Sequence, residues 1–418
     1  MVDQSDLPFR LLARRYGCNL AYTPMIHAKL FTTSPNYRDA FWRSDYSGHI
    51  KGDYPLVAQF CTSDKDVVLA AAKYVEHDPN VVAVDINAGC PQGIAKRGHY
   101  GAFLLEDGDC LVSIVENLSK NLTGCKVFVK VRLLPKTSAP ANKTEKINST
   151  DDDEDEKENE QLPYHETTYD IDASIALYKR LIAAGASLIT IHGRTRFQKG
   201  QLTGPVSLKA IKRVVDEIGH LVPIIANGGI SDLQSVQNVL EVTGANGVMS
   251  SEGILENPAL FYGCESCEND NDKENLGNVD FKNISRLRIT REYLQLCREY
   301  PPDDGGQGSG VKCIKGHVGK FLFPDMQVDE VNDGFRNLLS GCRSMEDLER
   351  FVDLVEDKQG QGKETNNKNE EELSWYMRHR GQGEKKYQKT MAVENIEISA
   401  DSAECFSNLF GGGDTADY

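Results

Sequence analysis

Two hydrophobic patterns alternate along the chain. Short, near-continuous apolar runs rich in Val and Ile recur, and such runs are typical of parallel strands buried on both faces. Segments with helical periodicity lie between them, several with an Asp or Ser cap before them and a glycine after them. We therefore predict strands at 19–25, 54–60, 81–87, 126–134, 186–192, 222–227 and 246–250.

Strict alternation of strand and helix predicts an α/β protein, either a barrel or a doubly wound sheet. A (β/α)8 barrel needs eight strands, whereas this chain opens with a helical pattern, SDLPFRLLARRYG, that no strand precedes. We interpret the pattern as a TIM barrel whose first strand is absent from this sequence. A seven-stranded open sheet is the alternative.

The patterns also predict how the chain divides. The barrel is expected to occupy residues 1–262, with an acidic, disordered insert at 136–165 after its fourth observed strand. Four helical patterns at 280–356 predict a small all-α domain. The remainder, 357–418, is rich in Gly, Gln, Asn and charged residues, which is typical of a disordered tail.

The net charge of −16 argues at first against a nucleic-acid partner. Two short segments, 151–160 and 264–275, carry −11 of that charge, and such runs are typical of solvated loops. The rest of the chain is only weakly acidic, and 378–389 is basic. Charge therefore does not exclude a nucleic-acid partner.

Composition bounds the location. No run approaches the roughly 18 apolar residues of a membrane span, and the N-terminus lacks the apolar core of a signal peptide. Eleven cysteines scattered through apolar segments suit a reducing compartment, so we expect the cytoplasm or the nucleus. Cys264 and Cys267 lack a second pair at zinc-like spacing, so no metal is predicted.

Polar residues end every predicted strand, and strand ends are where barrels build active sites. Lys130 lies within FVKVRLL, where an unpaired ammonium is costly to bury, so it either forms a salt bridge or donates to an anionic or electron-rich ligand. The loops ANGG and SSEG follow the last two strands, where barrels bind phosphate. This combination indicates FMN. The candidate residues are Gln59, Asn87, Cys90, Lys130, Arg132, His192, Arg194, Asn227, Gly228, Gly229, Ser251 and Glu252.

Two further candidates have open interpretations. Cys90 is either a buried filler, as most cysteines are, or a reactive thiol. His317 recurs with Lys312, Lys315 and Lys320 at helical spacing. That spacing predicts either a solvated helix face or one that contacts phosphate.

The run NAGCPQGIAKRGHYGAFLL closely resembles the signature of the tRNA-dihydrouridine synthases, FMN-dependent enzymes that reduce specific uridines of tRNA. The runs MVDQSDLPFR, YTPMIHAKLF, VAQFCTSD, VFVKVRL, IHGRTRFQKGQLTG, ANGGI and VMSSEGILENPALF match in the same order. The likeness covers 1–262 strongly and 280–355 more loosely. The details most similar to the eukaryotic branch that acts on uridines 16 and 17 of the D-loop are MVDQS, HAKLF, QGIAKRGHYG and RFQKGQ.

This resemblance implies a mechanism. NADPH or NADH reduces FMN, a hydride then passes from flavin N5 to C6 of a flipped-out uridine, and Cys90 protonates C5 as general acid. Asn87 is expected to position the uracil edge. Arg132 and Arg194 either contact tRNA phosphate or form salt bridges at the rim. The implied FMN contacts are Met1, Val2, Gln59, Lys130, His192, Asn227, Gly228, Gly229, Ser251 and Glu252.

The helical domain is expected to bind tRNA through its basic residues, and we expect a monomer without membrane or metal. The basic residues concerned are Arg286, Arg288, Lys312, Lys315, His317 and Lys320. Two other readings stay open. One is an FMN barrel that reduces a free small molecule, as dihydroorotate-type enzymes do. The other is a tRNA-binding protein that the missing first strand has left inactive. Flavin colour separates the last reading from the others.

Overall fold

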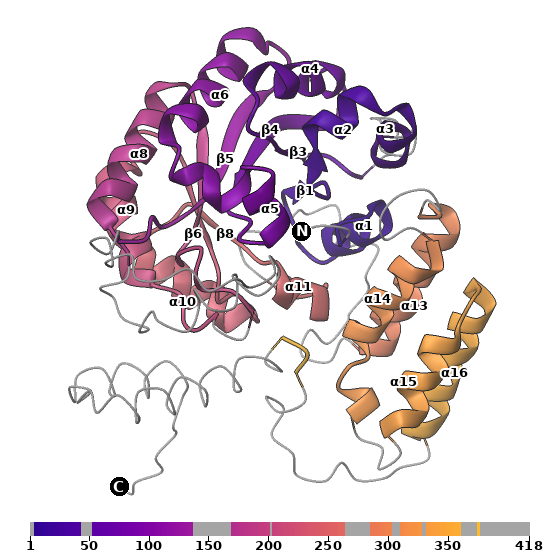
Figure 1. Ribbon diagram of the computed structural model, residues 1–418. Coiled ribbons are helices and arrows are strands. Elements are labelled where there is room, and N and C mark those ends of the chain that lie inside the picture. Colours follow the sequence, from indigo (N-terminus) through magenta and orange to yellow (C-terminus); the bar gives the residue numbers. More distant parts are fainter. Residues whose placement is uncertain are drawn as a thin grey trace, which may run out of the picture.

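The computed structural model describes residues 4–42, 52–136, 169–200, 203–263, 285–302, 310–327, 332–360 and 374–376. A curved parallel sheet lies inside a ring of helices (Figure 1). Its strand order is β1-β3-β4-β5-β6-β7-β8, and β2 also pairs with β3. The strands are β1 (Ala21–Tyr22), β2 (Ile26–His27), β3 (Leu56–Cys61), β4 (Val81–Ala88), β5 (Lys126–Arg132), β6 (Leu188–His192), β7 (Ile224–Asn227) and β8 (Gly247–Met249).

All seven predicted strand positions are confirmed, the first as the neighbouring pair β1 and β2. The strands pair in parallel throughout. Within the described residues β8 does not pair with β1, and no strand precedes the first helix. The fold is therefore a parallel (β/α) barrel that is open at one position, as the alternation of patterns predicted.

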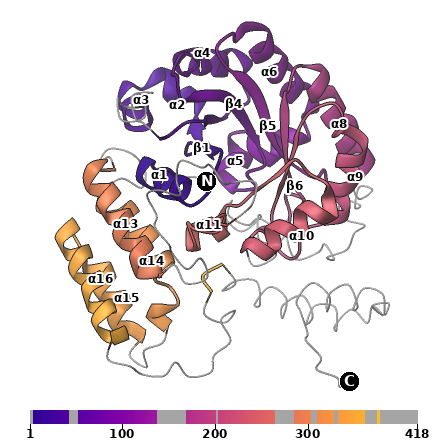
Figure 2. The same cartoon turned by 180° about the vertical axis from the view of Figure 1, so that it is seen from behind.

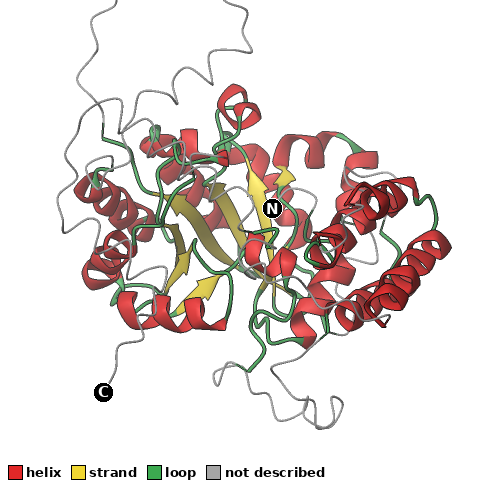
Figure 3. Ribbon diagram, turned by 90° about the horizontal axis from the view of Figure 1, so that it is seen from below, coloured by secondary structure: helices red, strands yellow, loops and turns green. Residues whose placement is uncertain are grey.

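Helices surround the sheet because its strands carry apolar residues on the outer face. Val84, Ile86 and Ala88 alternate along β4 and so share that face, and all three are fully buried. The helices and 3-10 turns of this part are α1 (Leu7–Arg15), α2 (Ala28–Thr33), α3 (Pro35–Phe41), α4 (Lys65–Val75), α5 (Gly93–Arg97), η1 (Gly101–Leu105), α6 (Gly108–Asn121), α8 (Ile171–Ala183), α9 (Leu208–Ile218), α10 (Leu233–Thr243) and α11 (Glu252–Glu256). Figure 3 shows the strands enclosed by these helices.

The predicted all-α part is also confirmed. It consists of α13 (Arg286–Glu299), α14 (Gly310–Phe321), η5 (Asp325–Gln327), α15 (Asn332–Gly341) and α16 (Met345–Gly360). Figure 2 shows these helices beside α1 and α11, at one side of the barrel. The last helix continues past the predicted boundary at 356. Nearly all of the predicted insert and most of the tail lie outside the described residues.

A shared core joins the helical part to the barrel. Residues of α1 and α11 belong to the same buried hydrophobic cluster as α13, α14 and α16. Two side chains of the helical part meet the buried carboxylate of Asp6: the Tyr293 hydroxyl donates to Oδ2 over 3.1 Å, and His317 Nε2 lies 2.8 Å from Oδ1. The Phe9 ring stacks on His317, with centroids 4.6 Å apart.

These contacts correct both interpretations of His317. Its side chain is 0% exposed, so it forms neither a solvated helix face nor a phosphate contact. Asp6, Cys313 and His317 do place potential metal-binding atoms within 4.8 Å of one another. The Asp6–His317 hydrogen bond already accounts for that proximity, and the expectation of no metal stays a prediction.

Two other expectations can be compared with the structure. None of the helices in the described ranges is long and apolar enough to cross a membrane. The eight cysteines of the described residues are all free thiols, and the predicted reducing compartment stays a prediction.

Candidate active site

Strand register brings the predicted polar side chains together at the carboxyl ends of the strands. Gln59 of β3 pairs with Asp85 of β4, and Asn87, two residues further along β4, pairs with Lys130 of β5. Paired positions in parallel strands and positions two apart point to the same face. All four side chains therefore face the barrel interior.

A second row of polar residues follows the same rule. Arg132 of β5 pairs with His192 of β6, which pairs with Asn227 of β7. The Asn227 amide donates to the Met249 carbonyl over 2.7 Å and so joins β7 to β8. The sequence placed these residues at strand ends, and the structure shows that they line one side of a single rim.

A chain of hydrogen bonds runs from the barrel interior to the Cys90 loop. Gln59 Nε2 donates to Asp85 Oδ2 over 2.9 Å, and Gln59 Oε1 accepts from Asn87 Nδ2, also over 2.9 Å. Asn87 Oδ1 then accepts the backbone N–H groups of Gly89 and Cys90, each at 3.0 Å. The loop that carries the thiol is thus held by side chains of two strands.

The 99–102 turn holds the Cys90 loop from its other side. The Ala102 N–H donates to the Cys90 carbonyl over 2.9 Å. Gly101 has φ +65°, and a Cβ there would lie 2.5 Å from that carbonyl oxygen. Only glycine fits this close approach. Cys90 itself is a partly exposed residue.

Lys130 lies next to this loop. Its ammonium is 3.9 Å from the point where a Cβ on Gly89 would be. Burial and the neighbouring Arg132 lower the pKa of Lys130 to about 8, although the charges of Asp85 and Cys90 oppose the shift. Within the described part of the chain Lys130 forms no ion pair, so the predicted salt bridge is not observed there. The group remains a donor directed at the site.

The two arginines of the site are tied to the backbone. Arg132 donates from Nε to the Gly89 carbonyl over 2.8 Å and from a terminal nitrogen to the Thr195 carbonyl over 2.7 Å. Arg194 donates to the Gly204 carbonyl. The arginines are 7% and 2% exposed. The phosphate contacts and rim salt bridges predicted for these arginines stay predictions.

Arg194 also determines the state of His192. One of its terminal nitrogens lies 3.0 Å from His192 Nε2. A guanidinium can only donate, so Nε2 must be the acceptor and the imidazole carries its proton on Nδ1. His192 therefore faces the site as a neutral ring in a fixed tautomer.

The glycine loop after β7 fits closely against these residues. Gly228 and Gly229 have φ +104° and +76°. A Cβ on Gly228 would lie 2.9 Å from the His192 ring, and one on Gly229 would lie 2.9 Å from Val206. Side chains larger than that of glycine are therefore excluded here. Ser251 and Glu252 follow at the start of α11.

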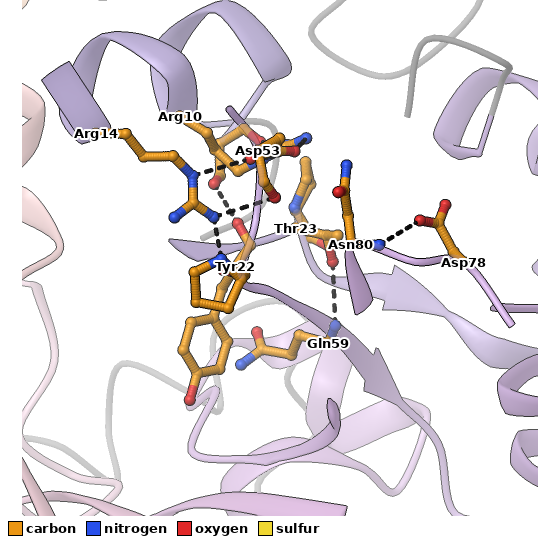
Figure 4. A network of polar contacts seen from close by, with 11 residues as sticks. Arg10, Arg14, Tyr22, Thr23, Asp53, Gln59, Asp78 and Asn80 are labelled. Atoms are coloured by element: carbon orange, nitrogen blue, oxygen red, sulfur yellow. Dashed lines mark hydrogen bonds and ion pairs between the residues drawn. The ribbon is translucent and has the colours of Figure 1, made fainter. Parts of the chain in front are cut away.

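A salt-bridge network holds α1 against the start of β3 (Figure 4). Arg10 and Arg14 both contact the Asp53 carboxylate, at 2.7 and 3.2 Å. The Thr23 hydroxyl accepts the Gln59 backbone N–H over 3.0 Å. The position of Gln59 thus depends on the segments before β3 as well as on β4.

Sequence reasoning missed three polar groups inside the barrel. Asp85 is 0% exposed, and within the described residues its Oδ1, the Tyr22 hydroxyl and the Thr190 hydroxyl lack hydrogen-bond partners. Burial raises the pKa of Asp85 to about 7, opposed by the Gln59 hydrogen bond and the charge of Lys130. The available signal was the spacing of Asp85 two residues before Asn87 in VDIN.

The other predicted site residues lie away from the barrel rim or outside the described residues. Met1 and Val2 are outside the described residues. Lys312 is exposed and Lys320 half-buried on α14, with the Lys320 ammonium 2.8 Å from the Gly316 carbonyl. Lys315 donates to the Ser340 carbonyl over 3.1 Å. These lysines belong to the helical part, not to the barrel rim.

The fold and the site define a (β/α)-barrel protein with a polar ligand site at the carboxyl ends of its strands. The family model described as dihydrouridine synthase (Dus) matches residues 1–148 and 167–307. The chain belongs to the dihydrouridine synthase family, and the resemblance stated from the sequence is confirmed.

Curated relatives agree with this membership. The chain is 39% identical over 329 residues to tRNA-dihydrouridine(16/17) synthase of Saccharomyces cerevisiae, covering 78% of this chain and 64% of that protein. It is 36% identical over 330 residues to a mouse protein named as like that synthase, covering 79% and 55%. For the Schizosaccharomyces pombe synthase the identity is 33% over 355 residues, covering 85% and 75%. The chain thus spans less than two thirds of the first two relatives.

Proposed function

We propose that this protein reduces uridines of tRNA to dihydrouridine, with FMN as the hydride carrier and NADPH or NADH as reductant. Family membership and the names of the relatives support the reaction, and those names include NAD(P)(+). The observation that carries the proposal is the position of Cys90. The residue is partly exposed on a loop held by Asn87, and its charge acts on the Lys130 ammonium, which lies next to that loop.

The rim residues fit a flavin. The Gly228–Gly229 loop leaves no room for side chains and offers backbone N–H groups, which suit a phosphate. When bound, FMN supplies hydride chemistry that no amino-acid side chain provides. The residues that would hold it are Gln59, Lys130, His192, Asn227, Gly228, Gly229, Ser251 and Glu252.

Cys90 acts as the acid in this proposal. Its thiol is proposed to deliver a proton to C5 of uracil. Asn87 presents its amide next to the same loop and is proposed to orient the uracil edge. Lys130 is proposed to donate to an electron-rich ring atom.

The substrate positions are proposed to be uridines 16 and 17. The relatives with 16/17 in their names match 78% to 85% of this chain, whereas a human relative named for 20a/20b matches 63% at 33% identity. A monomer located in the cytoplasm or the nucleus, where tRNA is found, belongs to the same proposal.

The decisive experiment uses purified protein, NADPH and tRNA that lacks dihydrouridine. Flavin is read as absorbance near about 450 nm, and dihydrouridine is mapped by position. Cys90→Ala is expected to keep flavin and NADPH oxidation but to lose dihydrouridine formation. Cys110→Ala is the matched control, because its thiol donates to the Ser63 carbonyl and takes no part in the hydrogen bonds described for the Cys90 loop.

The same assay tests the two other readings. Reduction of a free pyrimidine as fast as tRNA would favour a small-molecule oxidoreductase. Colourless protein that still binds tRNA would favour a binding protein without redox activity. Full dihydrouridine formation by Cys90→Ala would remove the role assigned to the thiol.

We also propose that the exposed side of α14 contacts tRNA. Lys312, Lys315 and Lys320 are expected to contribute through their charge, without the buried His317. Replacing the three lysines with Glu should weaken tRNA binding and flatten its salt dependence. Unchanged affinity and unchanged salt dependence would show that tRNA binds elsewhere.

A further inference from the structure

A buried carboxylate lies at the inner end of the hydrogen-bond chain that holds the Cys90 loop. Asp85 is 0% exposed on β4 and is bonded to Gln59, which is bonded to Asn87. The resemblance to known enzymes assigned roles to Gln59, Asn87 and Cys90, but not to Asp85. The direction of each hydrogen bond shows what this residue does.

An ionised carboxylate only accepts hydrogen bonds. Gln59 must therefore turn its NH2 group toward Asp85, and this leaves Oε1 facing Asn87. Asn87 must in turn direct its own NH2 group at that oxygen. Its Oδ1 is then left to accept the N–H groups of Gly89 and Cys90, as the distances of 3.0 Å show.

We propose that Asp85 is a positioning residue that orients the Gln59 and Asn87 amides and, through them, the backbone of the Cys90 loop. An amide alone cannot do this, because it can turn over and exchange its oxygen with its nitrogen, which is of nearly equal size. If residue 85 donated instead, both amides would turn over and the Asn87 NH2 group would face the two backbone N–H groups. The loop would then lose both hydrogen bonds.

The surroundings of Asp85 allow it to change state near neutral pH. The charged and titratable groups that face it are the Lys130 ammonium on β5 and the Tyr22 hydroxyl on β1. The pKa of Asp85 is raised to about 7 by burial, although the Gln59 hydrogen bond and Lys130 oppose the rise. Protonation makes the group a donor as well as an acceptor, so it no longer selects one amide orientation.

Asp85→Asn tests the proposal because it keeps the size of the side chain and removes the obligatory acceptor. Amide hydrogen exchange at Gly89 and Cys90, measured in the full chain at pH 8, is expected to be about tenfold faster, the change that loss of one ordinary hydrogen bond produces. Asp78→Asn is the control. Asp78 lies just before the opposite end of β4, where it accepts the Asn80 N–H over 2.9 Å, and its replacement should leave both exchange rates unchanged.

The effect on catalysis rests on the proposed function. In the tRNA assay Asp85→Asn should lower kcat by about tenfold while KM for tRNA stays within about twofold. The kcat of the wild-type protein is expected to fall as the pH drops below about 7, and Asp85→Asn should not show this fall. Asp78→Asn should show it as wild type does.

The outcomes separate this inference from the proposed function. Faster exchange at Gly89 and Cys90 in protein that makes no dihydrouridine would support the positioning role and refute the proposed reaction. Unchanged exchange and an unchanged pH profile in Asp85→Asn would overturn the positioning role. If Asp85→Asn fails to fold, the wild-type protein supplies the test. Protection of the Gly89 and Cys90 amides against hydrogen exchange must then fall as the pH drops through about 7, and constant protection would also overturn the positioning role.

Discussion

Gly101→Ala should displace the Cys90 loop without changing any group proposed to touch a ligand. Gly101 has φ +65°, and a Cβ added there would lie 2.5 Å from the Cys90 carbonyl oxygen and 3.0 Å from the Cys90 Cβ. Backbone atoms cannot yield to such contact by changing rotamer. The Cys90 backbone itself must therefore move, and its 2.9 Å hydrogen bond from the Ala102 N–H must stretch.

The magnitude can be worked from two separate effects. A left-handed backbone costs alanine about 1–2 kcal/mol, and overpacking of a tight contact costs about 1–3 kcal/mol. Gly263→Ala isolates the first effect, because Gly263 has φ +80° and, among the described residues, no heavy atom within 4 Å of an added Cβ. Gly101→Ala should therefore unfold in urea with about 1–3 kcal/mol less stability than Gly263→Ala.

The catalytic effect should be larger than the stability effect. A misplacement of about 1 Å can cost about a hundredfold in rate, so Gly101→Ala should lose about that much tRNA reduction at unchanged flavin content. Gly263→Ala should keep wild-type turnover. Equal stability and equal turnover of the two variants would refute the argument that Gly101 positions Cys90.

Three further variants test individual buried charges. Asp53→Ala leaves Arg10 and a second arginine of α1 without their carboxylate, so urea unfolding should show a loss of about 3–5 kcal/mol; a loss below about 1 kcal/mol would show that the network contributes little. Burial would raise the pKa of Asp6, but the charge and hydrogen bond of His317 and the other groups around it hold the pKa below 3.8. The carboxylate should therefore stabilise the fold above pH 3.8, and this stabilisation should be lost as the pH falls through the pKa of Asp6 in the folded protein. Asp6→Asn should lack that acid-dependent loss. The pKa of Asp85 is raised to about 7, so its ionisation costs stability as the pH rises from about 4 to 7. The stability of Asp85→Asn minus that of wild type should therefore be larger at pH 8 than at pH 5. An equal difference at the two pH values would contradict the raised pKa.

The fold was predictable because each strand is a short apolar run between helical patterns. Alternation predicted the parallel order, and the strand ends predicted which polar residues share a rim. The partners within that rim were not predictable. The pairing of Gln59 with Asp85, and of Lys130 with Asn87, depends on strand register. A slip of one residue would turn the side chains of a strand to the opposite face.

His317 shows why charge spacing alone failed as a guide. Three lysines at helical spacing indicated a solvated face, but Cys313, Ile314 and Phe321 lie four, three and four residues from the histidine on the same helix. Such positions form one stripe of a helix, and the structure buries that stripe against α1. The apolar neighbours therefore predicted burial better than the basic ones predicted exposure.

Asp85 shows how far the requirements of the site and of stability diverge. A buried carboxylate with an unpartnered oxygen costs free energy, and the Tyr22 and Thr190 hydroxyls nearby are equally unpartnered within the described residues. A barrel selected only for stability would carry apolar side chains at these inward positions. Polar groups that destabilise a core persist where they perform a task. Here the carboxylate accepts at the inner end of the hydrogen-bond chain, and the Gly89 and Cys90 N–H groups donate at its outer end, so both ends favour the same direction.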